Sequence, residues 1–350
     1  MTPMTRHNRV AVAMLLVWVG AAGAAPSTLR DHLKKDDAWF KSQEAAGIAA
    51  NVLSWQADDG GWPKNLDTAG KPFDGDRKTL RSTFDNGATT GELRFLARMA
   101  SATGQAKYRE AFNKGLDLIL AAQYANGGWP QSHPPPKGYG RHITFNDDCM
   151  ARLMMLVRDV ASGPEYAFVD ADRRKRCAEA FERGVQCILK CQIKVDGRLA
   201  GWCAQHDEVD FSPRPGRTFE PASLSGGESV GIVRVLMSIE KPSPQVVAAI
   251  EGAVAWLESA KIPGIRTEDR PDKNLPKGID RVVVKDPDAP PMWARFYNIQ
   301  TNQPMFVDRD GSVHDDLAGI GAERRSGYRW LGYWPARLLA EEYPAWKARR

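Results

Sequence analysis

Several sequence signatures of well-known site chemistries are missing from this 350-residue chain. Its five cysteines include no Cys-x-x-Cys pair, which argues against a structural zinc site. The sequence also contains no G-x-S-x-G nucleophile elbow, no phosphate-binding glycine loop and no EF-hand loop. No two histidines have the spacing of metal ligands. We therefore expect neither a serine hydrolase of the elbow type, nor a P-loop enzyme, nor an EF-hand calcium protein.

Strong net charge and long apolar runs are missing as well. The formal net charge is +5, or +3 without Arg6 and Arg9, which is too small to argue for nucleic-acid binding, although a modest positive excess suits an anionic substrate. The apolar run at Val10–Val19 is too short to span a bilayer, and no later run qualifies. We therefore expect neither nucleic acid nor a membrane as a partner, and we expect a monomer.

The first residues have the pattern of a secretory signal peptide. Arg6 and Arg9 precede the apolar run, and Ala22-Gly23-Ala24 provides a small-residue cleavage site. We predict a signal peptide at 1–24, a single domain at 25–350, and a secreted or periplasmic protein. The five cysteines of an exported chain permit one or two disulfides and leave at least one thiol, and no pairing is predicted.

An internal repeat of roughly seventy residues is the main positive signal. Gln56–Pro63 (QADDGGWP) recurs as Gln123–Pro130 (QYANGGWP), and Gln192–Trp202 is a looser copy. Helical periodicity precedes each copy, and a loop and a second helical pattern follow it. The preceding helices are predicted at Ala46–Trp55, Phe112–Ala122 and Cys177–Cys191.

Three such helical hairpins, packed side by side, would place equivalent ends on one face. The repeat therefore predicts a mainly α fold: a partial α/α toroid of about three helical hairpins, with long irregular loops and a few short strands. Further helices are expected at Gly227–Met237, Gln245–Ala260 and Ala336–Ala348, and strands at Arg281–Val284 and Met305–Val307.

The stretch Gly201–Ser229 is expected to be a long, stiffened loop. Pro213, Pro215 and Pro221 fix the backbone and disfavour a helix before them. Loops of this length in a compact chain are usually functional. Arg217 is the candidate functional residue within it, and the alternative is a surface arginine paired with Glu220.

Three aspartates stand at predicted helix starts. Asp85, Asp147 and Asp148 could each be a helix cap, because aspartate favours these positions. The repeat, however, would bring them together. Clustered carboxylates repel unless a cation lies between them, and oxygen ligands suit calcium. The sequence therefore also offers a calcium site assembled from separate segments.

Arginines and tryptophans among aromatic residues are the remaining candidates. Arg295 and Arg309 lie in such surroundings, where arginine can bind a carboxylate and stack on a ring. Arg324 has the same surroundings, and surface salt bridging is the alternative for it. Trp202 could be a sugar platform or a core residue.

The motifs together resemble the pectate lyases of polysaccharide lyase family 10, over essentially the whole mature chain. The matching stretches are FDNGATTGELRFLAR, NGGWPQ, ITFNDDCM, GWCAQHDEVDFSPRPGRTFEPASLSGGES, WARFYNIQTNQPMF–DRDG and ERRSGYRW. The resemblance implies a predominantly helical partial toroid and calcium-dependent β-elimination of polygalacturonate by the domain 25–350. His206 and Asn298 depart from the family pattern, which affects fine specificity rather than the chemistry.

The resemblance also implies roles for individual residues. Arg217 matches the catalytic base, which removes the C5 proton of a galacturonate unit. Asp85 and Asp147 match the ligands of the catalytic calcium, and the adjacent Asp148 is kept as an alternative ligand. The implied substrate contacts are Arg295 and Arg309, with Trp202 and Arg324 as further candidates.

Two other functions remain as alternatives. A glycoside hydrolase would need two carboxylates as acid and base, for which Glu220 and Asp207 are conceivable. A glycan-binding protein without activity would use the tryptophans as platforms. Formation of an unsaturated uronide, which absorbs in the near ultraviolet, separates elimination from both alternatives.

Overall fold

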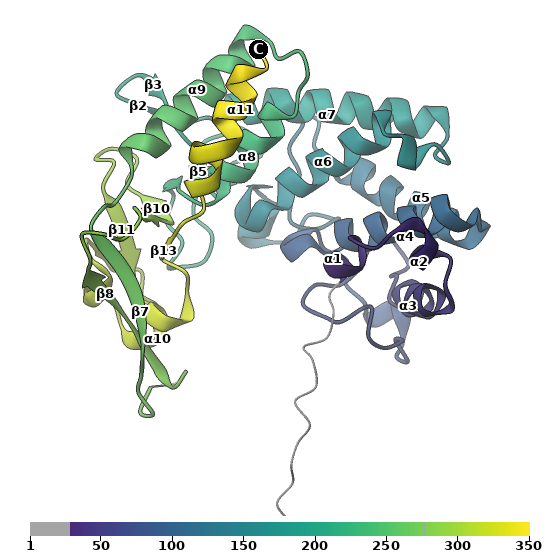
Figure 1. The fold of residues 1–350 in the computed structure, drawn as a ribbon, viewed down its shortest axis with the longest axis horizontal. Coiled ribbons are helices and arrows are strands. Elements are labelled where there is room, and N and C mark those ends of the chain that lie inside the picture. The colour runs from purple at the N-terminus through teal and green to yellow at the C-terminus, as the bar shows by residue number, and fades with distance from the viewer. Residues whose placement is uncertain (1–28, 276) are drawn as a thin grey trace, which may run out of the picture.

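The computed structural model describes residues 29–275 and 277–350 (Figure 1). The predicted signal peptide and its cleavage site lie outside these residues. Within the described part of the chain, no helix combines the length and the apolar character needed to cross a membrane.

Six helices form two layers in the first three quarters of the chain. Helices α4, α6 and α8 contact one another in sequence order, as do α5, α7 and α9, and each helix of the first set also packs on the next helix along the chain. Helices α1, α2 and α3 pack against α4. The helix bounds are α1 Leu29–His32, α2 Asp37–Phe40, α3 Gln43–Ser54, α4 Thr90–Thr103, α5 Ala106–Ala122, α6 Cys149–Ser162, α7 Ala171–Cys191, α8 Glu228–Met237 and α9 Pro244–Ser259.

Apolar spacing and caps explain these helices. In α7 the residues facing α6 recur at three- and four-residue steps, for example Cys177, Ala180 and Gly184, and they are buried. The side chain of Asp170 caps its start by accepting a hydrogen bond from the amide of Arg173 at 2.9 Å. The exposed face of α7 carries the charges, so burial of one stripe orients the helix.

The repeated tryptophans are structural. The indole Nε1 donates to a helix carbonyl in every copy: Trp62 to Val52 at 2.8 Å, Trp129 to Ile119 at 2.9 Å and Trp202 to Ile188 at 2.8 Å. All three rings are fully buried. Each indole therefore ties a Gly-Trp turn to the helix that precedes it.

The repeated glutamines join one copy to the next. The amide of Gln56 donates to the carbonyls of Gly60, within its own turn, and Ala111, on α5, both at 2.8 Å. Gln123 bonds Gly127 and Ala180 in the same way, and Gln192 bonds Ala200 and Ala249. These amides therefore set the spacing between successive helices of the layer.

The last quarter of the described chain is rich in strands. β7 and β8 form an antiparallel hairpin paired from Ile265↔Lys285 to Pro271↔Ile279. A second sheet has the order β12-β11-β10-β6. Short helices α10 (Ala322–Gly327) and α11 (Tyr343–Ala348) follow, and a turn of π-helix at Leu338–Glu342 leads into α11. The strand bounds are β1 Ile143–Thr144, β2 Lys194–Val195, β3 Arg198–Leu199, β4 Gln205–His206, β5 Pro213–Arg214, β6 Leu224–Ser225, β7 Ile265–Pro271, β8 Ile279–Lys285, β9 Trp293–Ala294, β10 Phe296–Tyr297, β11 Pro304–Val307, β12 Val313–His314 and β13 Leu331–Gly332.

The predicted fold class, a mainly α partial toroid, is wrong. The described residues mix helices with thirteen strands in five small sheets. The predicted strands at Arg281–Val284 and Met305–Val307 are confirmed within β8 and β11. Strand β7 was not predicted, because IRTEDRP is charged and has no apolar alternation. Its stability comes from backbone pairing with β8, which a sequence pattern does not reveal.

The long loop Gly201–Ser229 contains three of the two-residue strands. β4 pairs with β1 and β5, whereas β6 pairs with β10. The loop therefore connects the helical layers to the C-terminal sheet. All five cysteines are buried and free in this structure.

The glutamine links give a stability prediction. Gln192→Met should lower the free energy of unfolding by about 2–4 kcal/mol, because two buried carbonyls lose their donor. Gln245→Met, at an exposed position of α9, is the matched control and should change stability little. Urea denaturation measures both, and equal stability of the two variants would contradict the proposed link.

Candidate active site

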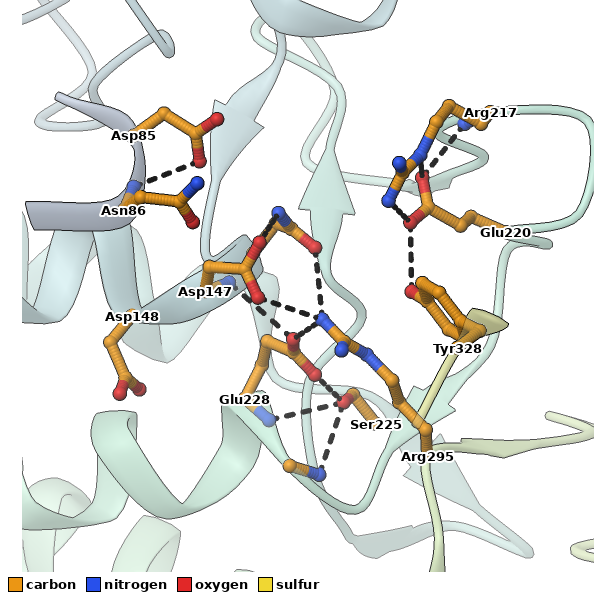
Figure 2. A network of polar contacts seen from close by, with 12 residues as sticks. Asp85, Asn86, Asp147, Asp148, Arg217, Glu220, Ser225, Glu228, Arg295 and Tyr328 are labelled. Carbon is orange, nitrogen blue, oxygen red and sulfur yellow. Dashed lines mark hydrogen bonds and ion pairs between the residues drawn. The ribbon is translucent and has the colours of Figure 1, made fainter. Parts of the chain in front are cut away.

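Two similar turns bring the predicted acidic residues together. A 3₁₀ turn at Asp85–Gly87 precedes α4, and another at Asn146–Asp148 precedes α6, and these turns contact each other. Asn86 and Asp147 both have left-handed backbone, with φ of 52° and 49°. Asparagine and aspartate tolerate this conformation better than other side chains with a Cβ. The turns therefore aim Asp85 and Asp147 into the same space (Figure 2).

Asp85 is buried and has a cationic partner. Its carboxylate forms an ion pair with the ammonium of Lys64 and accepts the amide of Asn86 at 3.1 Å. Lys64 follows the Gly-Trp turn of the first repeat, and sequence reasoning missed it.

Asp147 is linked to a buried arginine. Its Oδ2 accepts the side-chain amide of Asn146 at 2.7 Å, and its Oδ1 lies 3.1 Å from Nη2 of Arg295. The same nitrogen of Arg295 donates to Glu228 at 2.6 Å (Figure 2). Burial lowers the pKa of Arg295, but the charges of Glu228 and Asp147 outweigh it and raise that pKa overall. Arg295 is therefore a fixed cation beside the acidic pair.

Asp148 points elsewhere. Figure 2 shows its side chain turned away from Asp85 and Asp147. Its Oδ2 lies 3.9 Å from Nη2 of Arg152, and burial raises the pKa of the Asp148 carboxyl. Of the two alternatives that the sequence left open, Asp147 has the geometry of a partner for Asp85.

Asp85 and Asp147 suit a calcium ion by chemistry, since carboxylate oxygens are its usual ligands. Among the described residues, the group of three or more potential ligands within mutual reach is His142, Asp207 and Glu208, not the predicted three aspartates. That group is already paired, with Arg141 on Glu208 and Arg214 on Asp207. A cation at Asp85 and Asp147 would therefore need further ligands from a bound molecule.

Arg217 lies across the site in a two-pronged ion pair. Its Nε donates to Glu220 at 2.9 Å, Nη2 pairs with the other oxygen, and its backbone amide donates to the same carboxylate at 3.0 Å. The hydroxyl of Tyr328 donates to Glu220 at 2.8 Å. The Glu220 hydrogen bond raises the pKa of Arg217. Burial raises the pKa of Glu220, but these donors outweigh it, so its pKa is lowered.

The other predicted arginines gather on two aromatic rings. Cζ of Arg324 lies 4.2 Å from the ring centre of Phe219, and Cζ of Arg295 lies 4.9 Å from the ring centre of Tyr328. Arg324 is buried, whereas Arg309 is exposed and pairs with Glu323 at 2.8 Å. Burial lowers the pKa of Arg324, and the charges of Arg309 and Arg217 lower it further, against Glu323.

Trp202 does not belong to this surface. Its ring has no exposed area, and it serves the third repeat as the tryptophans of the other copies do. A ring without exposed surface cannot stack on a sugar, so the predicted substrate contact of Trp202 is corrected to a core role.

Glu228, Lys64 and Tyr328 complete the site and were not predicted. Glu228 and Tyr328 lie in stretches that the sequence had marked, but glutamate at a helix start and tyrosine beside arginine have ordinary structural explanations. Only their contacts with Arg295 and Glu220 distinguish them.

Comparisons with known proteins give one consistent family. The family model described as pectic acid lyase matches residues 56–339. The structure is similar to that of family 10 polysaccharide lyase from Cellvibrio cellulosa, with 34% identity, a TM-score of 0.78, and coverage of 90% of this chain and 94% of that one. A mutant of the Cellvibrio cellulosa enzyme in complex with trigalacturonic acid gives 34% identity, a TM-score of 0.76, and coverage of 88% and 96%. None of the curated proteins compared with the chain matches it.

Proposed function

Because the chain belongs to the pectic acid lyase family, we propose that it is a calcium-dependent pectate lyase that cleaves polygalacturonate by β-elimination. The observation that carries this proposal is the arrangement of Asp85 and Asp147 beside Arg295, with Arg217 across the same site. The trigalacturonic acid bound by the similar enzyme supports the substrate class.

The domain and its location are part of the proposal. We propose one catalytic domain at 25–350, because the buried apolar residues of the described part of the chain form one cluster that extends from Phe40 to Trp346. We also propose a monomer that is secreted or periplasmic, in keeping with a polymeric substrate outside the cell.

Asp85 and Asp147 would hold the calcium, together with the carboxylate of the substrate. When bound, the ion would supply positive charge that stabilises the enolate-like negative charge at C5 and its carboxylate. Arg295 is fixed beside Asp147 and contributes positive charge to the same region. Arg309 and Arg324 are proposed to bind the carboxylates of neighbouring units, because arginine pairs with carboxylates in a two-pronged geometry.

Arg217 is the proposed base. Its neutral guanidine removes the C5 proton, the C–H electron pair becomes the C4–C5 double bond, and the C4–O bond breaks. The leaving oxygen then takes a proton from solvent. Free arginine is almost always protonated, so the site must favour the neutral form.

Two sets of neighbours act on the charge of Arg217 in opposite directions. Glu220 raises its pKa in this structure. The cations act the other way: the charges of Arg217 and Arg324 repel each other, and a like charge nearby favours the neutral form of an ionisable group. When substrate binds, its carboxylates and the bound ion would add to these opposing effects on the charge of Arg217. Before that, the ion pair with Glu220 keeps the guanidine oriented.

The hydrolase alternative receives no support from its two carboxylates. Glu220 is held by Arg217 and Tyr328, and Asp207 is held by Arg214 at 2.8 Å. An acid and a base for hydrolysis would have to titrate freely, which these pairs oppose.

The first test of the function concerns the metal. Polygalacturonate treated with the enzyme and calcium should develop near-ultraviolet absorbance from the unsaturated product, and excess chelator should abolish it.

Asp147→Asn should weaken calcium binding, measured by titration calorimetry with substrate present, by at least about tenfold, because a charged ligand is lost. Asp148→Asn is the matched control and should weaken calcium binding only slightly. A larger loss of calcium affinity in Asp148→Asn than in Asp147→Asn would make Asp148 the ligand.

The second test separates base from binder. Arg217→Lys should lower kcat by at least about a hundredfold with little change in KM, because the shorter side chain misplaces the base. Arg295→Lys keeps a cation but loses the planar geometry, so it should mainly raise KM. Steady-state kinetics on polygalacturonate give both constants. A raised KM with unchanged kcat in Arg217→Lys would place the base elsewhere.

The third test uses pH. Activity should rise with pH, because only neutral Arg217 accepts the proton. Glu220 raises the pKa of Arg217, so Glu220→Gln should move the rising limb of the kcat profile to lower pH, while lost orientation lowers the maximum by about ten- to a hundredfold. Tyr328→Phe leaves the carboxylate in place and should shift the limb less. An unmoved limb in Glu220→Gln would show that Arg217 is not the titrating base.

A further inference from the structure

A cavity of about 840 Å³ lies next to the acidic pair. Residues of α4, α6 and α8 line it, three helices that lie side by side (Figure 1). Its volume is in the range of ligand pockets, about 300–1,000 Å³. The mechanism above uses none of this space.

The cavity borders the candidate active site. Lys64 lines it and also pairs with Asp85, so one ammonium borders both spaces. Asp148, which turns away from Asp85 and Asp147, is another lining residue. The cavity and the acidic pair are therefore neighbours, as adjacent binding sites along one polymer would be.

Basic side chains predominate in the lining, with five basic residues against three acidic ones. Arg94 and Arg234 line the cavity, while their ion-pair partners Asp159 and Glu342 are not among its lining residues. Arg152 donates through Nη1 to the carbonyl of Asp147 at 2.7 Å, and its side chain remains 41% exposed. These guanidinium groups suit a ligand with several carboxylates.

A glycine on α4 keeps part of the cavity open. Gly91 lines it, and a Cβ added there would meet nothing within 4 Å. Glycine inside a helix costs about 1 kcal/mol relative to alanine, so helix stability does not explain it. A larger side chain at Gly91 would extend into free space within the cavity.

We propose that this cavity is a distal subsite, which binds uronate units of the substrate chain beyond those at Asp85, Asp147 and Arg217. This inference rests on the proposed function. Carboxylates along the chain would pair with Arg152 and Arg234, and the space before Gly91 would admit a sugar ring. The enzyme should then prefer long oligogalacturonates to short ones.

The steric test fills the cavity without changing its charge. The readout is the ratio of kcat/KM for hexagalacturonate to that for the shortest oligomer cleaved. Gly91→Phe should lower this ratio at least tenfold, mainly through KM for the hexamer. Gly47→Phe is the matched control, since Gly47 is also a helical glycine with nothing within 4 Å, and it does not line the cavity. It should leave the ratio unchanged.

The charge test uses two arginines that share one partner. Arg234 and Arg337 both pair with Glu342, but only Arg234 lines the cavity. Arg234→Gln should raise KM for the hexamer about tenfold, whereas Arg337→Gln should not.

A wild-type enzyme with equal kcat/KM for hexagalacturonate and for the shortest oligomer would contradict the proposed subsite. So would a Gly91→Phe variant that unfolds at the normal temperature and keeps the wild-type ratio of these two constants. An unchanged KM for the hexamer in Arg234→Gln would show that Arg234 does not bind the substrate. Absence of cleavage by the wild-type enzyme at any chain length would instead refute the proposed function, so the two failures are distinguishable.

Discussion

The buried guanidinium of Arg295 is the interaction on which the site depends. It lies between β9 and β10 of the C-terminal strands, yet its partners Asp147 and Glu228 belong to the helical layers. A cation buried to this extent needs its carboxylates, and removing one partner of such a pair typically costs about 3–5 kcal/mol. The charge therefore fixes how the strand-rich part meets the helices, and it balances the acidic pair at the same point.

The two arginines of the site differ in how far their surroundings enclose them. Arg295 is almost enclosed and packs on the ring of Tyr328, so it can serve as a fixed electrostatic element. Arg217 is nearly half exposed, with its side chain at 47%, and only its partner Glu220 is buried. A buried carboxylate under an accessible guanidinium orients the arginine while leaving one face open to a substrate. This asymmetry suits a base whose charge has to change during the reaction.

The repeats explain how carboxylates from distant segments meet. Each copy ties its Gly-Trp turn to a helix through an indole and to the next copy through a glutamine amide. The loops that follow lead into equivalent helices, whose first residues lie next to one another. Asp85 and Asp147 therefore lie together, and Glu228 lies beside them. The binding chemistry therefore sits at the helix starts, while the turns behind them provide rigidity.

By itself, the sequence determined the helices, the repeat and most of the candidate residues. Periodicity and Gly-Trp turns are local, and they were sufficient to predict the helices that precede each copy, including α7. The tertiary structure alone decided that Trp202 is buried, that Asp147 rather than Asp148 faces Asp85, and that Tyr328 supports Glu220. It also decided the mixed fold class, because β7 depends on backbone pairing with β8. Side-chain direction at a left-handed turn, burial and strand pairing all depend on residues far away in the chain, so no local pattern encodes them.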